Sequence, residues 1–255
     1  MPRSSRLGLV AVLLVAVACQ TVPITGRHQV MLVQEGDEMK MGLDAYQEVL
    51  KKSRVSNDPA INQQVTRVGR RIAAATERTD YQWEFKVLED KQANAFCLPG
   101  GKVAVYTGIL PITRDDAGLA AVLGHEAAHA IARHGGERMS QELLVQTGLQ
   151  ATQVALAQRD PATVTAVTAL LGAGASVGVL LPYNRAQESE ADHLGLVYMA
   201  KAGYHPSAAR DLWVRMAAAG GSRQPEFLST HPVPETRIKQ IEGWIPEALK
   251  YYQPK

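Results

Sequence analysis

The sequence predicts an α+β domain that is mostly helical, with a small three-stranded sheet directly before one central helix. Apolar residues recur at helical spacing over most of the chain, for example at Val65, Val68 and Ile72. Trp83, Phe85 and Val87 instead alternate with polar residues, and Pro99-Gly100-Gly101 supply a turn between two short apolar runs, which is typical of β-strands. The chain is 46% apolar and long enough to bury a single sizeable core.

Two helices are expected before the sheet. The first covers Asp37–Leu50, and the second begins at Asp58-Pro59, because proline is well suited to the first turn of a helix. Three strands follow. Trp83, Phe85 and Val87 alternate with polar residues, and two further strands, Ala93–Leu98 and Lys102–Tyr106, are joined by a Pro-Gly-Gly turn.

The central helix is expected over Asp115–His134. Aspartates at its first turn favour the positive end of the helix dipole, and the glycines at positions 135 and 136 are expected to end it. Later helices are expected over Glu142–Gln158, over Asn184–Ala200 and after the turn at Tyr204-His205-Pro206.

Residues 125–129 of the central helix read His-Glu-Ala-Ala-His, the spacing of a zinc-protease motif. Residues four apart share one helix face, so His125 and His129 can bind one zinc ion, and Glu126 can act as general base on a water beside it. The alternative is two histidines on an ordinary buried helix. That alternative leaves two buried imidazoles with no obvious partner except each other or a metal.

A catalytic zinc site needs a third protein ligand. Within the expected helix Asn184–Ala200, Glu188 and Asp192 share a face, whereas Glu190 falls on the opposite side, towards solvent. Glu188 is therefore the candidate ligand, and Asp192 is the candidate carboxylate that orients an imidazole. The alternative is a solvated acidic face of a surface helix.

Four segments in this order resemble metallopeptidase family 48, which includes the CAAX prenyl protease, the HtpX-type membrane proteases and periplasmic lipoprotein proteases. The segments are residues 94–101 (Asn-Ala-Phe-Cys-Leu-Pro-Gly-Gly), 125–135, 185–195 and 229–232 with the following Arg237-Ile238. Cys97 replaces a small residue that is usual in the family. The resemblance extends from about Gly36 to Ile241.

The resemblance implies a gluzincin-like zinc protease domain over residues 36–255, with one zinc ion per chain and Glu188 as its third ligand. It also implies work in envelope protein quality control, on unfolded or misfolded envelope polypeptides. In zinc proteases of this design an edge strand pairs with the substrate backbone. Lys102, Val103, Ala104 and Val105, or the neighbouring strand, are the candidates; an ordinary covered hairpin is the alternative.

His231 lies between Thr230 and Pro232, in a loop expected near the metal. Its imidazole could stabilise the oxyanion of the tetrahedral intermediate. It could equally occupy the open position of the zinc ion and keep the enzyme latent. A loop histidine that caps the following helix is the third interpretation.

The N-terminus has the pattern of an export signal over residues 1–18. Arg3 and Arg6 precede an apolar run, Leu7–Ala18, that is too short to span a membrane. Cys19 directly follows a small residue and resembles a lipidation site, so residues 19–35 would be a lipid-anchored linker to the outer membrane on its periplasmic side. Ordinary signal cleavage is the alternative.

The charge balance and the cysteine content limit which partners and reactive groups are expected. Loss of Arg3 and Arg6 would leave 27 − 2 = 25 basic residues against 25 acidic ones, which gives no reason to expect nucleic acid as a partner. Cys97 would then be a single free thiol. A small buried hydrophobe is the favoured interpretation of Cys97, and a reactive site is the alternative.

Residues 161–184 carry no charged side chain. Their length would allow a membrane span. We favour a buried or lid-like helical hairpin, because the segment is rich in Ala, Gly, Thr and Ser.

A non-catalytic function competes with proteolysis. A latent or non-catalytic, zinc-containing, chaperone-like module could bind outer-membrane proteins without cutting them. The intact Glu126 argues against it, because a purely structural zinc site needs no base.

Overall fold

The computed structural model describes residues 19–219, 227, 229, 231 and 235–254. It divides into two compact units. Unit 1 comprises the residues up to Glu35 together with His134–Gln187, and unit 2 comprises Gly36–Arg133 together with the residues from Glu188 onward. Each unit is described by itself.

Unit 2 contains the predicted three-stranded sheet, which confirms the mostly helical α+β class. The strands β3 (Glu84–Leu88), β4 (Ala95–Leu98) and β5 (Lys102–Tyr106) lie in the order β3-β5-β4. β5 is parallel to β3 and antiparallel to β4. Gly100 and Gly101 have φ values of 84° and 82°, which permits the tight turn between β4 and β5.

The strand order corrects one expectation. β5 contains Lys102, Val103, Ala104 and Val105, and it is the middle strand, so both of its edges already pair with neighbours. These residues therefore offer no free edge to a substrate. The edge strand in contact with the central helix is β4.

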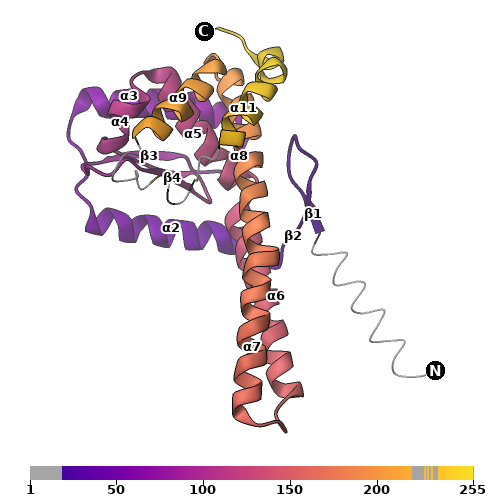
Figure 1. Ribbon diagram of the computed structural model, residues 1–255. Helices are drawn as coiled ribbons and strands as arrows, with labels where there is room; N and C mark the ends of the chain where they lie inside the picture. Colours follow the sequence, from indigo (N-terminus) through magenta and orange to yellow (C-terminus); the bar gives the residue numbers. More distant parts are fainter. Residues whose placement is uncertain (1–18, 220–226, 228, 230, 232–234, 255) are drawn as a thin grey trace. The chain divides into compact units, whose positions relative to one another are not determined.

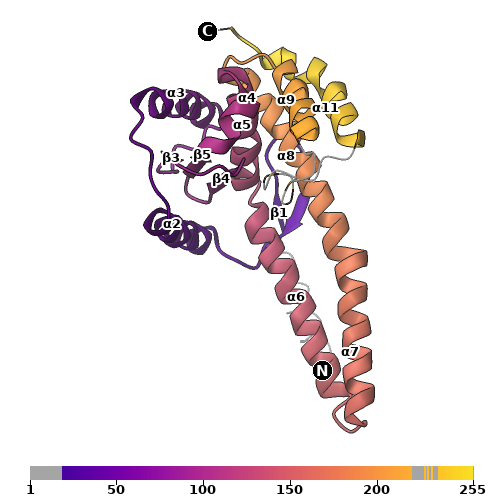
Figure 2. The ribbon, with the colours of Figure 1, turned by 60° about the vertical axis from the view of Figure 1, so that its left-hand side comes forward.

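Helices cover both faces of the sheet, as Figures 1 and 2 show. The helices α3 (Pro59–Ala75) and α5 (Asp116–Ile131) lie on one face and α2 (Glu35–Lys52) lies on the other. Tyr46 of α2 is buried against Leu88 and Ala104 of the sheet. The predicted start of the second helix is confirmed, because Asp58 accepts hydrogen bonds from the backbone N–H groups of Ala60 and Ile61.

The central helix begins as predicted but ends early. Asp115 caps α5 by accepting a hydrogen bond from Gly118 N. The helix stops at Ile131, and Arg133 adopts a left-handed conformation with φ 57°. The buried Arg133 guanidinium lies 2.5 Å from Glu38 Oε1, which favours this turn. The two glycines at 135 and 136 do not end the helix; they lie in the first turn of α6 (His134–Ala155).

The remaining helices of unit 2 complete the core. Three helices follow in the chain: α8 (Leu181–Lys201), α9 (Ser207–Ala219) and α11 (Glu235–Ala248). α9 packs against both α5 and α11. The short elements of this unit are η1 (Thr107–Ile109), α4 (Leu110–Thr113) and η3 (Leu249–Tyr251).

Unit 1 consists of two hairpins. β1 (Cys19–Thr21) pairs with β2 (His28–Val30) in antiparallel fashion. α6 packs against α7 (Pro161–Ala175), which continues through the π-helical turn η2 (Ser176–Leu180) into α8. The expected helical hairpin is confirmed, because α7 packs against α6. Its expected burial is wrong, because α7 and η2 have no buried residue. A hairpin of two helices has only one contact face, so the outer face of α7 stays exposed.

The crossing of α5 and α8 depends on two glycines. A Cβ atom at Gly195 would lie 2.9 Å from His125 N, and one at Gly124 would lie 2.9 Å from Gly195 O. Atoms at such distances clash, so any side chain at either position would push the two helices apart. His125 directly follows Gly124, so this contact sets how close the histidine helix comes to α8.

We predict that Gly195→Ala separates α5 from α8 and lowers both stability and zinc binding. The expected loss in the free energy of unfolding is about 1–3 kcal/mol, the usual cost of overpacking a core. Urea unfolding and the zinc content of the purified protein measure the two effects. Gly243→Ala is the matched control, because nothing lies within 4 Å of the place on α11 that its added methyl group would take. Equal zinc content and stability in both variants would contradict the prediction.

Candidate metal centre

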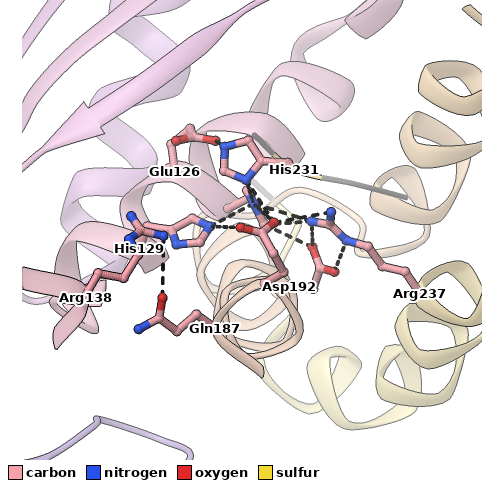
Figure 3. Close-up of polar contacts among 9 residues, drawn as sticks. Glu126, His129, Arg138, Gln187, Asp192, His231 and Arg237 are labelled. Atoms are coloured by element: carbon pink, nitrogen blue, oxygen red, sulfur yellow. Dashed lines mark hydrogen bonds and ion pairs between the residues drawn. The ribbon is translucent and has the colours of Figure 1, made fainter. Parts of the chain in front are cut away.

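Four metal-binding side chains converge in unit 2. His125 and His129 come from successive turns of α5, Glu188 comes from α8, and His231 follows α9 in the chain. One ligand atom from each residue lies within 4.8 Å of the others. Figure 3 shows His129 and His231 pointing towards the same place. The sequence predicted the first three as ligands and left the role of His231 open.

The distances between these atoms fit a tetrahedral zinc ion. His125 Nε2 lies 3.1 Å from His129 Nε2 and 3.1 Å from His231 Nδ1. The Glu188 carboxylate lies 2.9 Å from His231 Nδ1, 3.3 Å from His129 Nε2 and 3.5 Å from His125 Nε2. Zinc–ligand bonds of about 2.0–2.1 Å give a tetrahedron whose edges are about 3.3 Å long. The donor set therefore fits zinc in type and in spacing.

Glu126 lies beside the donor set and is 4% exposed. Its Oε1 atom has no hydrogen-bond partner among the residues that the structure describes, and it lies 3.4 Å from His231 Nε2. Burial raises the pKa of Glu126 above its usual range. A buried carboxylate oxygen without a hydrogen bond is suited to receive a proton from a water molecule or a substrate.

Asp192 orients the first histidine. Its Oδ1 atom lies 3.0 Å from His125 Nδ1, so the other ring nitrogen of His125, Nε2, faces the metal ligands. Burial acts to lower the pKa of His125, but hydrogen bonds to Asp192 and Glu188 outweigh it and raise that pKa to about 9. Zinc binding must therefore displace a proton from this imidazole.

Arg237 on α11 is the site residue that the sequence analysis did not assign. Its Nε and Nη2 atoms lie 2.5 Å and 2.9 Å from the two Asp192 oxygens, and Nη1 lies 3.3 Å from Glu188 Oε2. Its guanidinium carbon lies 3.8 Å from the centroid of the Trp213 ring. Burial acts to raise the pKa of Asp192, but the charge of Arg237 outweighs it, and the pKa is lowered. The only signal in the sequence was that Arg237-Ile238 follows residues 229–232 in the family resemblance.

Glu190 does not face solvent as expected, since it is only 7% exposed. From Gln187 onward α8 is surrounded by other elements on nearly all sides, so its face opposite Glu188 is covered as well. Glu190 does not belong to the group of converging ligands in the described residues. Cys97 on β4 is 8% exposed, and burial raises the pKa of its thiol, as expected of a small buried hydrophobe.

Comparison with known proteins agrees with this site. Residues 59–245 match the family described as Peptidase family M48. The chain belongs to peptidase family M48. The metal of this M48 site is zinc, as its ligands and their spacing indicate.

Two curated relatives show the range of similar proteins. The M48 chain is 40% identical over 232 residues to the mitochondrial metalloendopeptidase OMA1 of Schizosaccharomyces pombe, covering 89% of this chain and 66% of the relative. It is 29% identical over 229 residues to the beta-barrel assembly-enhancing protease of Escherichia coli, covering 87% of this chain and 46% of the relative. The chain thus spans about half to two thirds of the length of these relatives.

We predict that Asp192→Asn weakens zinc binding about 10–100-fold, the usual effect of removing a carboxylate that orients a metal-bound histidine. A competition titration against a zinc chelator measures the affinity. Asp211→Asn is the matched control, because the Asp211 side chain is 52% exposed on α9 and pairs with Arg210. Thermal unfolding of the zinc-free variants shows whether each variant is folded, so a lower zinc affinity can be distinguished from a loss of folded structure. An unchanged zinc affinity in a folded Asp192→Asn protein would contradict the assigned role.

Proposed function

We propose that this M48 chain is a zinc-dependent endopeptidase that hydrolyses peptide bonds in misfolded or unassembled polypeptides of the bacterial cell envelope. The observation that carries the proposal is the buried carboxylate of Glu126, whose Oε1 atom accepts no hydrogen bond from the described residues, beside a zinc-binding set of His125, His129 and Glu188. A purely structural zinc site does not need such a group. The names of the two relatives support the substrate class, since one is a metalloendopeptidase and the other a beta-barrel assembly-enhancing protease.

Different residues of the site would have different roles in peptide-bond hydrolysis. When bound, zinc polarises the scissile carbonyl and makes a neighbouring water more acidic. Glu126 accepts the proton of the attacking water on a carboxylate oxygen and then delivers it to the leaving amine nitrogen. The raised pKa of Glu126 makes it the stronger proton acceptor. Asp192 keeps the Nδ1 side of His125 occupied, and Arg237 holds Asp192 in place.

The substrate backbone would pair with β4 and not with β5. Asn94 O accepts a hydrogen bond from Tyr106 N, so the even-numbered residues of β4 face β5. The backbone groups of Ala95 and Cys97 therefore point to the open edge, where an extended peptide can add a strand. Side chains on alternate positions of that peptide would then decide specificity.

Two residues that follow α9 in the chain, Phe227 and His231, lie against both parts of this site. Phe227 N donates to Ala93 O at the start of the β4 edge, and His231 N donates to Phe227 O. His231 Nδ1 also fills the fourth place in the set of zinc ligands. We propose that His231 blocks the metal in a latent resting state, and that Phe227 and His231 must leave these positions before a substrate can reach the metal and the β4 edge.

The proposed setting is the periplasm. An export signal over residues 1–18 and lipidation of Cys19 would anchor the chain to the outer membrane, in keeping with the periplasmic lipoprotein branch of the family. The competing function, a non-catalytic binding module for outer-membrane proteins, would use the same β4 edge but would not need Glu126.

We predict that Glu126→Gln retains zinc but cleaves a denatured, fluorescently labelled polypeptide about 10²–10⁴-fold more slowly, because the general base is lost. Zinc content and the rate of fluorescence release are measured on the same preparation. Glu247→Gln is the control, since that exposed carboxylate on α11 pairs only with His193 among the described residues. Undiminished cleavage by Glu126→Gln would exclude Glu126 as the base. Binding without cleavage by the unchanged chain and by His231→Ala would favour the binding module.

We predict that His231→Ala raises the cleavage rate by about tenfold or more, because the competent state is no longer a minor population. Cleavage rates of the variant and of the unchanged chain are compared at equal zinc content. His205→Ala is the control, because His205 is exposed and bonds locally to Ser207. A fall of about 10²–10³-fold would instead assign oxyanion stabilisation to His231.

A further inference from the structure

Exposed apolar side chains are concentrated in unit 1. Of the seventeen large apolar side chains that are exposed in the described residues, five lie in unit 2 and twelve lie in unit 1. The twelve are Ile24, Val30, Leu32, Leu143, Leu144, Val154, Leu170, Leu171, Val177, Val179, Leu181 and Tyr183. Nine of them belong to the α6–α7 hairpin and its continuation, and this extent of apolar surface marks an interaction site.

The hairpin carries almost no charge from Leu143 onward. Between Leu143 and Asn184 the only charged residues are Arg159 and Asp160, which are adjacent, of opposite sign and located at the turn between the helices. The helical run Pro161–Lys201 is long and apolar enough to cross a membrane, and none of its most apolar part is buried. The partner of this surface must therefore be apolar and need not carry charge.

A single membrane crossing conflicts with the metal centre. His129 precedes the hairpin and Glu188 follows it, yet both belong to one zinc site, so the chain must return to the side from which it left. A second crossing by α6 is disfavoured as well. Its uncharged part, Leu143–Gln158, has sixteen residues and is about 24 Å long, whereas the hydrocarbon core is about 30 Å thick.

The two helices of the hairpin differ in their outer faces. Gln146, Gln150 and Gln153 are exposed at helical spacing on α6. The outer face of α7 and η2 presents Leu170, which is 74% exposed, and Val177, which is 68% exposed. Leu143 and Val154 are exposed beside the glutamines of α6, at 50% and 77%. A mixed amide and apolar face on α6 and an uncharged apolar face on α7 suit a hairpin that lies in the interface of a bilayer.

We propose that the α6–α7 hairpin docks on a lipid bilayer from one side, with the α7 face in the acyl-chain region and the glutamines of α6 at the headgroups.

The hairpin belongs to the same unit as the proposed lipidation site, which favours a lipid bilayer over a second copy of the chain as its partner. β1 begins at Cys19, the proposed lipidation site, and its partner β2 is fixed to α6 within the same unit. Arg27 donates to both oxygens of the buried Glu137 carboxylate at 2.6 and 2.8 Å, and Leu32 N donates to Ser140 Oγ at 2.9 Å. An acyl chain on Cys19 would hold this unit at the membrane surface.

The stretch Leu143–Asn184 should bind neutral and anionic bilayers alike, because its two charges, Arg159 and Asp160, cancel. The test uses full-length chains in which Cys19→Ser prevents acylation and Cys97→Ala removes the buried thiol. A single cysteine is then introduced by Val177→Cys or by Gln150→Cys and labelled with an environment-sensitive fluorophore. We expect the label at position 177 to shift to the blue on vesicles of phosphatidylcholine, with or without phosphatidylglycerol, and the label at position 150 to shift much less.

Substitution of the α7 face provides a second measurement. The triple variant Leu170→Gln, Val177→Gln and Leu181→Gln should lower partition into neutral vesicles by about tenfold or more, since each substitution removes apolar contact with the acyl chains. The matched control replaces three exposed apolar residues of unit 2, Leu43→Gln, Val214→Gln and Leu249→Gln. Every chain carries the same residues 1–18, so their contribution cancels. Cleavage of a denatured polypeptide without vesicles should be the same in both triple variants, which separates docking from the proposed proteolysis.

Three outcomes would overturn the proposal. A blue shift without vesicles that grows with protein concentration would assign the face to a second copy of the chain. A shift only on vesicles with phosphatidylglycerol would indicate an electrostatic contact made elsewhere. Equal partition of the two triple variants, with no shift at position 177, would show that the hairpin does not enter lipid.

Discussion

The close approach of α5 to α8 is the constraint on which the metal centre depends. His125 and Glu188 are sixty-three residues apart in the chain, and their helices meet where Gly124 faces Gly195. Because neither glycine has a side chain, the two backbones come close enough for an imidazole and a carboxylate to share one ion. All later features of the site build on this crossing.

A series of buried ion pairs and hydrogen bonds then stabilises the position of the zinc ligand His125. Arg237 is stacked on Trp213 and binds Asp192, which in turn binds the outer nitrogen of His125. These groups are buried, so each charge would be costly without its partner. Asp192 and Arg237 compensate each other, and the lowered pKa of Asp192 keeps it ionised. Glu126 is the exception, since its Oε1 atom accepts no hydrogen bond from the described residues and is left for chemistry.

Regulation and membrane location would be added around this metal centre by other parts of the chain. Phe227 N donates to Ala93 O beside the edge of β4, and His231 takes the fourth ligand position, so a substrate strand would compete with these two residues. The α6–α7 hairpin is inserted in the chain between His129 and Glu188, and docking it on a bilayer would leave the ligand set unchanged. In this view a protease core and a membrane contact occupy separate units of one chain.

The sequence by itself determined the local features. The caps of α3 and α5, the spacing of His125 and His129 and the pairing of Glu188 with Asp192 on one face all follow from the 3.6-residue helical repeat, which acts within a few residues. Only the tertiary structure decided the rest. The middle position of β5, the burial of Glu190 and the contact of Arg237 with Asp192 depend on which distant elements pack together. The left-handed turn at Arg133 depends on its partner Glu38, ninety-five residues away. The exposure of α7 likewise depends on what packs nearby, because apolar composition shows that a helix needs a partner but not whether that partner is protein or lipid.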